Sequence, residues 1–304
     1  MRRRLSAYAA ALLLSAAAAA REELNVVSFG ADPSGSSPST PAVVAAVSSC
    51  AAIGGCVLYF PPGTYSVTPF NLTSYCELRL DAATLRASDT FSDWAIIAPL
   101  PSYGRGRDFP GPRYTSLIHG FNLTDVRITS NSSVHGVVDG HGERWWEAVK
   151  TGQLVLTPGH LVEFVWSSFI EIDRVDFRDS PFWNLHLWSS HDLWVHDLSI
   201  TAPLHSTNTD GVDPDSSSNV LIENLIIANG DDGIAIKSGW APWGVQYGVP
   251  TRNVTIRGLT VTTQSACVAI GSEMSGGIED VVVRDVTCLQ VRGCRAKMRG
   301  SPRV

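Results

Sequence analysis

The sequence predicts an all-β fold, a right-handed single-stranded parallel β-helix in which short strands stack coil upon coil. Five copies of one eight-residue pattern, apolar-x-apolar-x-x-apolar-x-apolar, run through the second half of the chain. The copies begin at Ile170, Leu193, Val220, Val254 and Val281, so they lie 23, 27, 34 and 27 residues apart. Repeats of this length are typical of units that bury a core only by stacking on their neighbours.

The content of each repeat indicates strands rather than helices. Each repeat holds two short alternating runs rich in β-branched residues, and none contains ten or more residues of helical periodicity. A second apolar set lies between successive copies, at Leu185/Leu187, Val212, Ile234/Ile236 and Val268/Ile270. Each coil therefore has at least two sheet faces, with apolar side chains inside the tube and polar ones outside. Functional residues are expected on an outer face or in a loop.

The two ends of the chain differ from the repeats. Residues 1–20 combine three arginines, an apolar run too short to span a bilayer and an alanine-rich end, which is typical of a secretory signal peptide. We predict a signal peptide over 1–20 and a single β-helix domain over 21–304. Residues 292–304 lack the apolar alternation. We therefore expect C-terminal coils to be missing and the last coil to fray.

Four Asn-x-Ser/Thr sequons and six cysteines are consistent with export of the protein. The sequons at Asn71, Asn122, Asn131 and Asn253 are potential glycosylation sites. An oxidising compartment permits three disulfides, and the sequence leaves their pairing open. The net charge of −6 and the 17% of charged residues provide no basic patch for nucleic acid. We expect no nucleic-acid or membrane partner and a monomer.

Three acidic residues give the clearest chemical signal. Gly211 and Gly233, which follow Asp210 and Asp232, are 22 residues apart, close to one coil. Stacked coils would bring Asp210 and Asp232 to about 4.8 Å, with Asp231 beside them. Carboxyl groups this close do not all ionise freely, so they can supply a proton donor and a base. Glycosidic hydrolysis requires that division of roles.

Other interpretations of these acids remain open. Regular strand alternation would point Asp210 and Asp232 into the tube, so we interpret Gly211 and Gly233 as bends that redirect the chain. The acids could instead cap local turn amides. They could also bind calcium for an elimination reaction, but the absence of basic groups beside them disfavours that option, and no metal or other cofactor is expected.

Several segments resemble motifs of the polygalacturonases, glycoside hydrolase family 28, and particularly plant-type members. They include NTDGVDPDSS (208–217), GDDGIAIKSG (230–239) and GSEMSGG (271–277), with GGCVLYFPPGTY (54–65) and VVDGHGERWW (137–146) upstream. The resemblance covers nearly everything after residue 20. It implies a pectin-lyase-like solenoid, an extracellular cell-wall location and hydrolysis of α-1,4-linked galacturonan in pectin, an acidic polysaccharide.

The resemblance also implies residue roles. Asp231 would protonate the leaving oxygen, while Asp210 and Asp232 would activate water with inversion at the anomeric carbon. GCRAK (293–297) resembles a Gly-x-Arg-Ile-Lys motif, so Arg295 and Lys297 would bind substrate carboxylates. Lys237 is a further predicted substrate ligand. Since it matches Asp215 one coil away, an ion pair between these two side chains is an equal alternative.

Two departures from the family pattern support a competing hypothesis. Ala266 stands where the family commonly has histidine, and the chain stops seven residues after Lys297, where members usually continue. The alternative is a catalytically weak or silent β-helical pectin-binding paralogue. The sequence leaves open endo against exo cleavage and galacturonan against rhamnogalacturonan.

Overall fold

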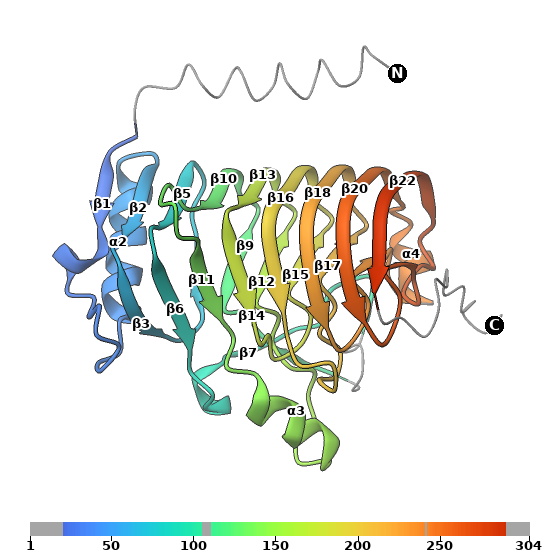
Figure 1. The fold of residues 1–304 in the computed structure, drawn as a ribbon, viewed down its shortest axis with the longest axis horizontal. Helices are drawn as coiled ribbons and strands as arrows, with labels where there is room; N and C mark the ends of the chain where they lie inside the picture. Colours follow the sequence, from blue (N-terminus) through green and yellow to red (C-terminus); the bar gives the residue numbers. More distant parts are fainter. Residues whose placement is uncertain (1–20, 105–110, 241, 290–304) are drawn as a thin grey trace.

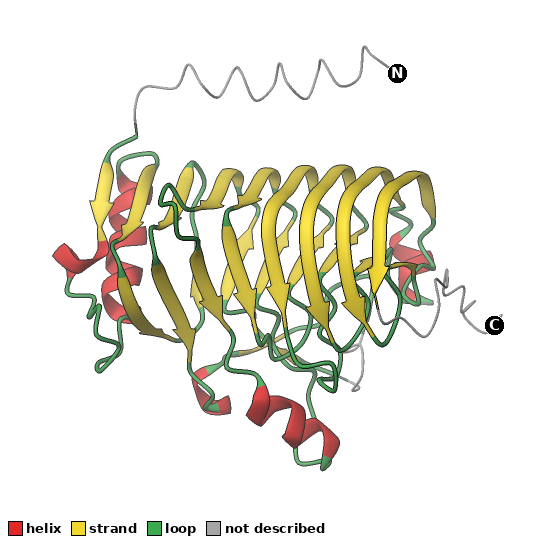
Figure 2. Ribbon diagram, in the orientation of Figure 1, coloured by secondary structure: helices red, strands yellow, loops and turns green. Residues whose placement is uncertain are grey.

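The protein winds as a parallel β-helix along one axis (Figure 1). The computed structural model describes residues 21–104, 111–240 and 242–289. Strands make up the tube, whereas the helices lie at its ends and beside it (Figure 2). The predicted signal peptide over 1–20 lies outside the described residues.

Within the described residues the strands form sheets of thirteen, seven and two strands. The largest sheet has two arms, one of β1 (Glu23–Asn25), β2 (Cys56–Phe60), β5 (Cys76–Leu80), β10 (Thr124–Thr129) and β13 (Ser168–Asp173), the other of β3 (Gly63–Val67), β6 (Ala83–Ala87), β11 (Gly136–Asp139) and β14 (Val175–Arg178). Both arms pair with β16 (His191–Thr201), which is followed by β18 (Ser218–Asn229), β20 (Thr251–Thr263) and β22 (Ile278–Leu289).

The seven-stranded sheet forms the remaining face of the tube and positions the candidate site. It consists of β4 (Phe70–Asn71), β9 (Ile118–Phe121), β12 (Val162–Val165), β15 (Leu185–Trp188), β17 (Val212–Asp215), β19 (Ile234–Ile236) and β21 (Val268–Ile270). The small antiparallel sheet pairs β7 (Ile96–Ile97) with β8 (Arg113–Tyr114). The helices are η1 (Val26–Phe29), α2 (Thr40–Ala52), η2 (Phe91–Asp93), α3 (Glu143–Lys150) and α4 (Trp243–Tyr247).

Strand register confirms the stacking predicted from the repeats. The first residues of the five copies are successive partners in the ladder, from Ile170 through Leu193, Val220 and Val254 to Val281. The residues at all four apolar positions of the first four copies are at most 4% exposed and belong to one continuous core. Each copy therefore supplies the same layer of side chains, one coil after another.

The two central residues of the eight-residue pattern form a corner between the two faces. One of them has a positive φ in every copy, namely Arg174, Asp197, Asn224, Gly258 and Asp285. A residue in the left-handed region turns the strand, so the apolar side chains on both sides of it point into the tube. This explains why two residues, rather than one, separate the second and third apolar positions of the pattern.

Helix α2 is an element that the sequence analysis missed. It packs its buried residues Ala42, Val43, Ala46 and Cys50 against the first coils. These residues are spaced as on one helical face, but they lie far from the repeats on which the fold prediction rested. The helix covers the core at the end where the coils begin (Figure 1).

Strand β22 is the last described coil. Among the described residues it pairs with β20 alone. Val282 and Val283 of β22 are about half exposed, whereas Val281 and Val286 are partly buried against the core. The core is therefore less completely covered at β22 than in the coils before it.

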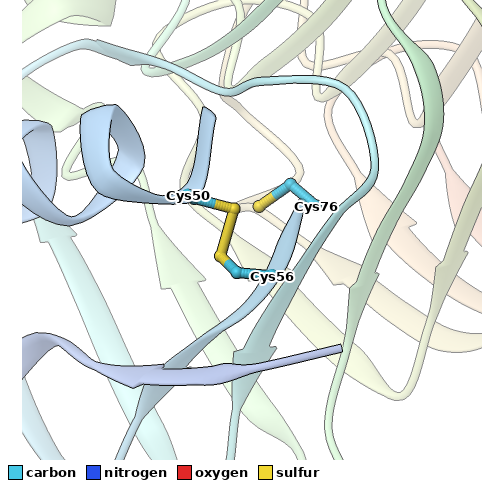
Figure 3. Close-up of side chains that lie close together, drawn as sticks. All are labelled: Cys50, Cys56 and Cys76. Carbon is cyan, nitrogen blue, oxygen red and sulfur yellow. A yellow bond between two sulfur atoms is a disulfide. The ribbon is translucent and has the colours of Figure 1, made fainter. Parts of the chain in front are cut away.

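The cysteines form two disulfides within the described residues. Cys50 pairs with Cys56 and Cys267 pairs with Cys288, while Cys76 carries a buried free thiol. The Cys76 sulfur lies beside the first disulfide, because Cys76 is the register partner of Cys56 (Figure 3). Burial raises the pKa of Cys76 to about 12, which keeps the thiol protonated and unreactive. Cys288 occupies the last apolar position of the fifth copy of the pattern and packs against the core as well as forming its disulfide.

Candidate active site

The three predicted acids meet at the start of two neighbouring strands. Asp210 precedes β17, and Asp231 and Asp232 precede β19 in the next coil. The Gly211 amide donates to the Asp232 carbonyl at 3.0 Å, which fixes the stacking of the two segments. Carboxylate oxygens of all three acids lie within 4.8 Å of one another. The one-coil spacing thus brings the acids together as predicted.

The glycines after the acids allow the coils to approach closely. A Cβ on Gly211 would lie 2.3 Å from the Gly233 carbonyl oxygen, and one on Gly233 would lie 2.6 Å from the Cys267 carbonyl oxygen. The acids precede β17 and β19 rather than lying inside them, so strand alternation does not govern where they point. The difficulty raised by strict alternation therefore does not arise, and in the structure the two glycines permit close contact between coils.

Asp232 is held by the next coil. The Ser265 hydroxyl and the Ala266 amide donate to its Oδ1 at 2.5 and 2.9 Å. Ala266 is buried with Ala235 and Ala269 in a small apolar cluster. The position predicted to lack an imidazole therefore contributes a backbone N–H to one of the acids. Asp231 is partly exposed, whereas Asp210 and Asp232 are buried.

Burial dominates the ionisation of Asp210. It raises the pKa of this carboxyl well above its ordinary value, and the charges of Asp231, Asp213 and Asp232 raise it further. The Lys237 ammonium opposes them. The predicted raised pKa within the cluster is confirmed in direction, but burial contributes more than mutual repulsion.

Lys237 is buried behind the acids rather than presented at the surface. Its Nζ lies 2.8 Å from Glu273 Oε2, 3.2 Å from Asp210 Oδ2 and 3.6 Å from Asp213 Oδ1. It also lies 4.0 Å from the centre of the Trp183 ring. Lys237 and Asp215 are backbone neighbours in adjacent coils, as the sequence indicated. The ammonium nevertheless binds these other carboxylates, and at 2% exposure it is not displayed as a surface ligand for substrate.

A buried charge network continues from the acids along the outer face of the seven-stranded sheet. His186 on β15 contacts Asp215 through Nε2 at 3.2 Å and Glu163 through Nδ1 at 2.9 Å. Burial would lower the pKa of His186, but these two carboxylates outweigh it and raise the pKa to about 9. Arg113 donates to Glu163 at 2.9 Å. Burial would raise the pKa of Glu163, but Arg113 and the neighbouring imidazoles hold it well below its ordinary value.

A segment from an earlier coil covers this network. The Tyr103 hydroxyl donates to Asp215, and the Trp188 indole donates to the Ser102 hydroxyl at 2.9 Å. The Trp240 amide donates to the Ser102 carbonyl, also at 2.9 Å. Leu100, Tyr103 and four further buried side chains form a second apolar cluster over the sheet. The cover excludes water from the charges and strengthens the interactions between them.

The comparisons with known proteins agree with this geometry. Residues 115–248 match the model of glycosyl hydrolases family 28, and residues 24–111 match that of rhamnogalacturonase A/epimerase, pectate lyase-like. A probable polygalacturonase of Vitis vinifera is 44% identical over 270 residues, covering 87% of this chain and 54% of the relative. The chain is therefore similar to glycosyl hydrolases family 28 over residues 115–248 and to this polygalacturonase over most of its own length.

Solved polygalacturonases share the fold. An exopolygalacturonase from Thermotoga maritima aligns with a TM-score of 0.77 and 25% identity, covering 89% of this chain and 67% of that one. A polygalacturonase from Erwinia carotovora ssp. carotovora aligns with a TM-score of 0.72 and 23% identity, covering 90% and 71%. These neighbours support the predicted right-handed, pectin-lyase-like β-helix.

The chain spans about half the length of the curated relatives it matches. Arg295 and Lys297, the other predicted substrate ligands, lie outside the described residues. Within the described residues no helix is long and apolar enough to cross a membrane.

Sequence reasoning missed several members of the buried network. Glu163, Asp213 and Tyr103 received no role, although Glu163 is a charged residue within an otherwise apolar strand and Asp213 lies between Val212 and Pro214. That placement was the available signal, because a charge in a buried strand requires partners on neighbouring strands. The partner segment containing Tyr103 precedes β17 by about a hundred residues, and no local pattern links the two.

Proposed function

We propose that this protein is a glycosidase that hydrolyses α-1,4-galacturonosyl linkages in pectin. The observation that carries the proposal is the cluster of Asp210, Asp231 and Asp232, whose carboxylate oxygens lie within 4.8 Å of one another. The relatives named polygalacturonase and exopolygalacturonase support the substrate class.

Asp231 is the proposed proton donor. It is the partly exposed acid of the three, so it can reach a polymer bound at the surface. Its proton passes to the glycosidic oxygen as the bond from that oxygen to the anomeric carbon breaks. Asp210 and Asp232 hold the attacking water and accept its proton as the new carbon–oxygen bond forms. Arg295 and Lys297 remain proposed ligands for galacturonate carboxylates.

The proposed reaction inverts the anomeric centre, as the family resemblance implies. Inverting enzymes commonly separate their two carboxyl groups by about 6.5–9.5 Å and retaining enzymes by about 5–5.5 Å. The present cluster contains three acids, with one oxygen of each within 4.8 Å of the others, so two acids can share one water while the third protonates the leaving oxygen. Proton NMR of the first product anomer tests this directly, and release with unchanged configuration would contradict inversion.

We also propose that the protein acts outside the cell, in the plant-type cell wall. Two disulfides within the described residues are typical of an oxidising compartment. The predicted signal peptide over 1–20 is consistent with export.

Release of reducing ends from polygalacturonate by the purified protein tests the proposal. Asp231→Asn, purified in parallel, is the control for contaminating activity, and a neutral galactan is the control for carboxylate recognition. We expect release by the parent on polygalacturonate alone. Binding of polygalacturonate without release above the Asp231→Asn control would support the silent pectin-binding paralogue instead.

A further inference from the structure

Lys237 is one of three lysines in the chain, and it is enclosed by acids. The carboxylates of Asp210, Asp213 and Glu273 lie around its ammonium group, at 3.2, 3.6 and 2.8 Å. A buried ammonium is expensive in free energy unless carboxylates surround it. These three carboxylates outnumber the one cation, so its charge is shared among them.

The ionisable groups that surround Lys237 show which acids its positive charge can affect. The ionisable groups around Lys237 come from every packed element. They are His160 before β12, Glu163 on β12, His186 on β15, Asp210, Asp213 and Asp215 at β17, Asp231 and Asp232 before β19, Glu273 after β21, and Tyr103 of the covering segment. Among the described residues, Lys237 is the side chain whose ammonium directly contacts an acid proposed to activate water.

We propose that Lys237 is a positioning residue for the hydrolysis, which holds Asp210 in the ionised form that a water-activating base requires, and that Glu273 limits this effect by competing for the same ammonium. The expected effect on the rate of hydrolysis rests on the proposed function. The structural basis is that Asp210 and Glu273 share the Lys237 ammonium, whose Nζ lies closer to Glu273 than to Asp210. Glu273 is itself fixed by the Ser272 hydroxyl at 2.8 Å.

The sign of each effect follows from the charges. Removing the positive charge in Lys237→Met favours the protonated form of Asp210, so the acidic limb of the kcat/KM profile moves to higher pH. Removing the competing negative charge in Glu273→Gln leaves more of the ammonium to Asp210, so the same limb moves to lower pH. The two variants therefore shift the limb in opposite directions.

The kinetic experiment measures the pH dependence of kcat/KM on polygalacturonate for both variants. Lys150→Met is the matched control, because Lys150 lies on α3 with a 78% exposed side chain. We expect a shift of about one pH unit in Lys237→Met, equal to about tenfold in rate below the limb. Lys150→Met should follow the parent. If both site variants lose rate equally at every pH and the acidic limb stays at the pH of the parent, Lys237 has a merely structural role. If Lys237→Met fails to fold, Glu273→Gln tests the proposal alone: a limb moved to lower pH supports it, and an unmoved limb or one moved to higher pH overturns it.

A second measurement does not need turnover. Protein labelled with ¹³C-lysine gives few Cε signals, and the Lys237 signal should show an inflection as its carboxylate neighbours titrate. We expect that inflection to change in Asp210→Asn and to persist in Asp280→Asn. An inflection in an inactive parent would overturn the proposed function but keep the Lys237–Asp210 coupling. An inflection that Asp210→Asn leaves unchanged would overturn the coupling itself.

Discussion

Asp213→Asn should make the protein more stable at neutral and alkaline pH. Asp213 is completely buried on β17, and within the described residues neither carboxylate oxygen accepts a hydrogen bond. Burial raises its pKa to about 7 from an ordinary value of 3.8, although Lys237 and His186 oppose the rise. The folded state therefore binds the proton more tightly than the unfolded state does, and stability is lost as the pH rises through about 7.

The magnitude follows from the difference between the two pKa values. About three pH units at roughly 1.4 kcal/mol each correspond to roughly 4 kcal/mol, of which about 2–3 kcal/mol falls between pH 5 and pH 9. Asparagine stays neutral throughout that range. The free energy of unfolding of Asp213→Asn minus that of the parent should therefore grow by this amount as the pH rises.

Urea unfolding across this pH range measures that difference. Asp280→Asn is the matched control, because Asp280 is exposed and its positive φ suits asparagine equally well. Other groups that titrate in both proteins cancel in the comparison. A difference that stays constant within about 0.5 kcal/mol would refute the argument that ionised Asp213 destabilises the fold.

Three further changes test the site and the coils. Asp231→Asn should lower kcat by roughly 10²–10⁴ with unchanged unfolding, since it removes the proposed proton donor, and activity within about threefold of the parent would exclude that role. Gly211→Ala should destabilise by about 1–3 kcal/mol, because its Cβ would lie 2.3 Å from the Gly233 carbonyl oxygen, and an unchanged urea midpoint would show that the coils can separate freely. Cys288→Ser opens a disulfide between residues 21 apart and should cost about 3 kcal/mol. Hydrogen exchange should then rise in β22 before β20, and equal protection in both strands would contradict the partial cover seen at β22.

The stacking of coils could be predicted because it depends on local periodicity. Each eight-residue copy carries its own two apolar pairs and its own corner, so one inspection of the sequence gives the register from Ile170 to Val281. The acids could be predicted for the same reason, since Asp210 and Asp232 lie at equivalent places in consecutive coils. Periodicity did not reveal α2, which belongs to no repeat and covers an end rather than extending the tube.

The partners of the acids could not be predicted from register alone. Lys237 matches Asp215 along the ladder, yet its side chain reaches diagonally to Asp210 and Glu273. A four-carbon stem covers more than one coil spacing, so the ladder partner of a lysine need not be its electrostatic partner. Tyr103, which binds Asp215 itself, comes from a segment outside the stacked strands.

The coil spacing also explains why the buried acids of the seven-stranded sheet need basic side chains beside them. Side chains in one outer column lie about 4.8 Å apart, so a column of like charges would repel along its whole length. In the seven-stranded sheet the outer column instead alternates basic and acidic residues, through His119, Glu163, His186 and Asp213. It then continues with Ala235 and Ala269. Asp213 thus has a basic neighbour in its column on one side only, and Lys237 supplies the other positive charge from the end of β19. The raised pKa of Asp213 arises where the alternation stops, which is the place where a protein can keep a carboxyl group protonated near neutral pH.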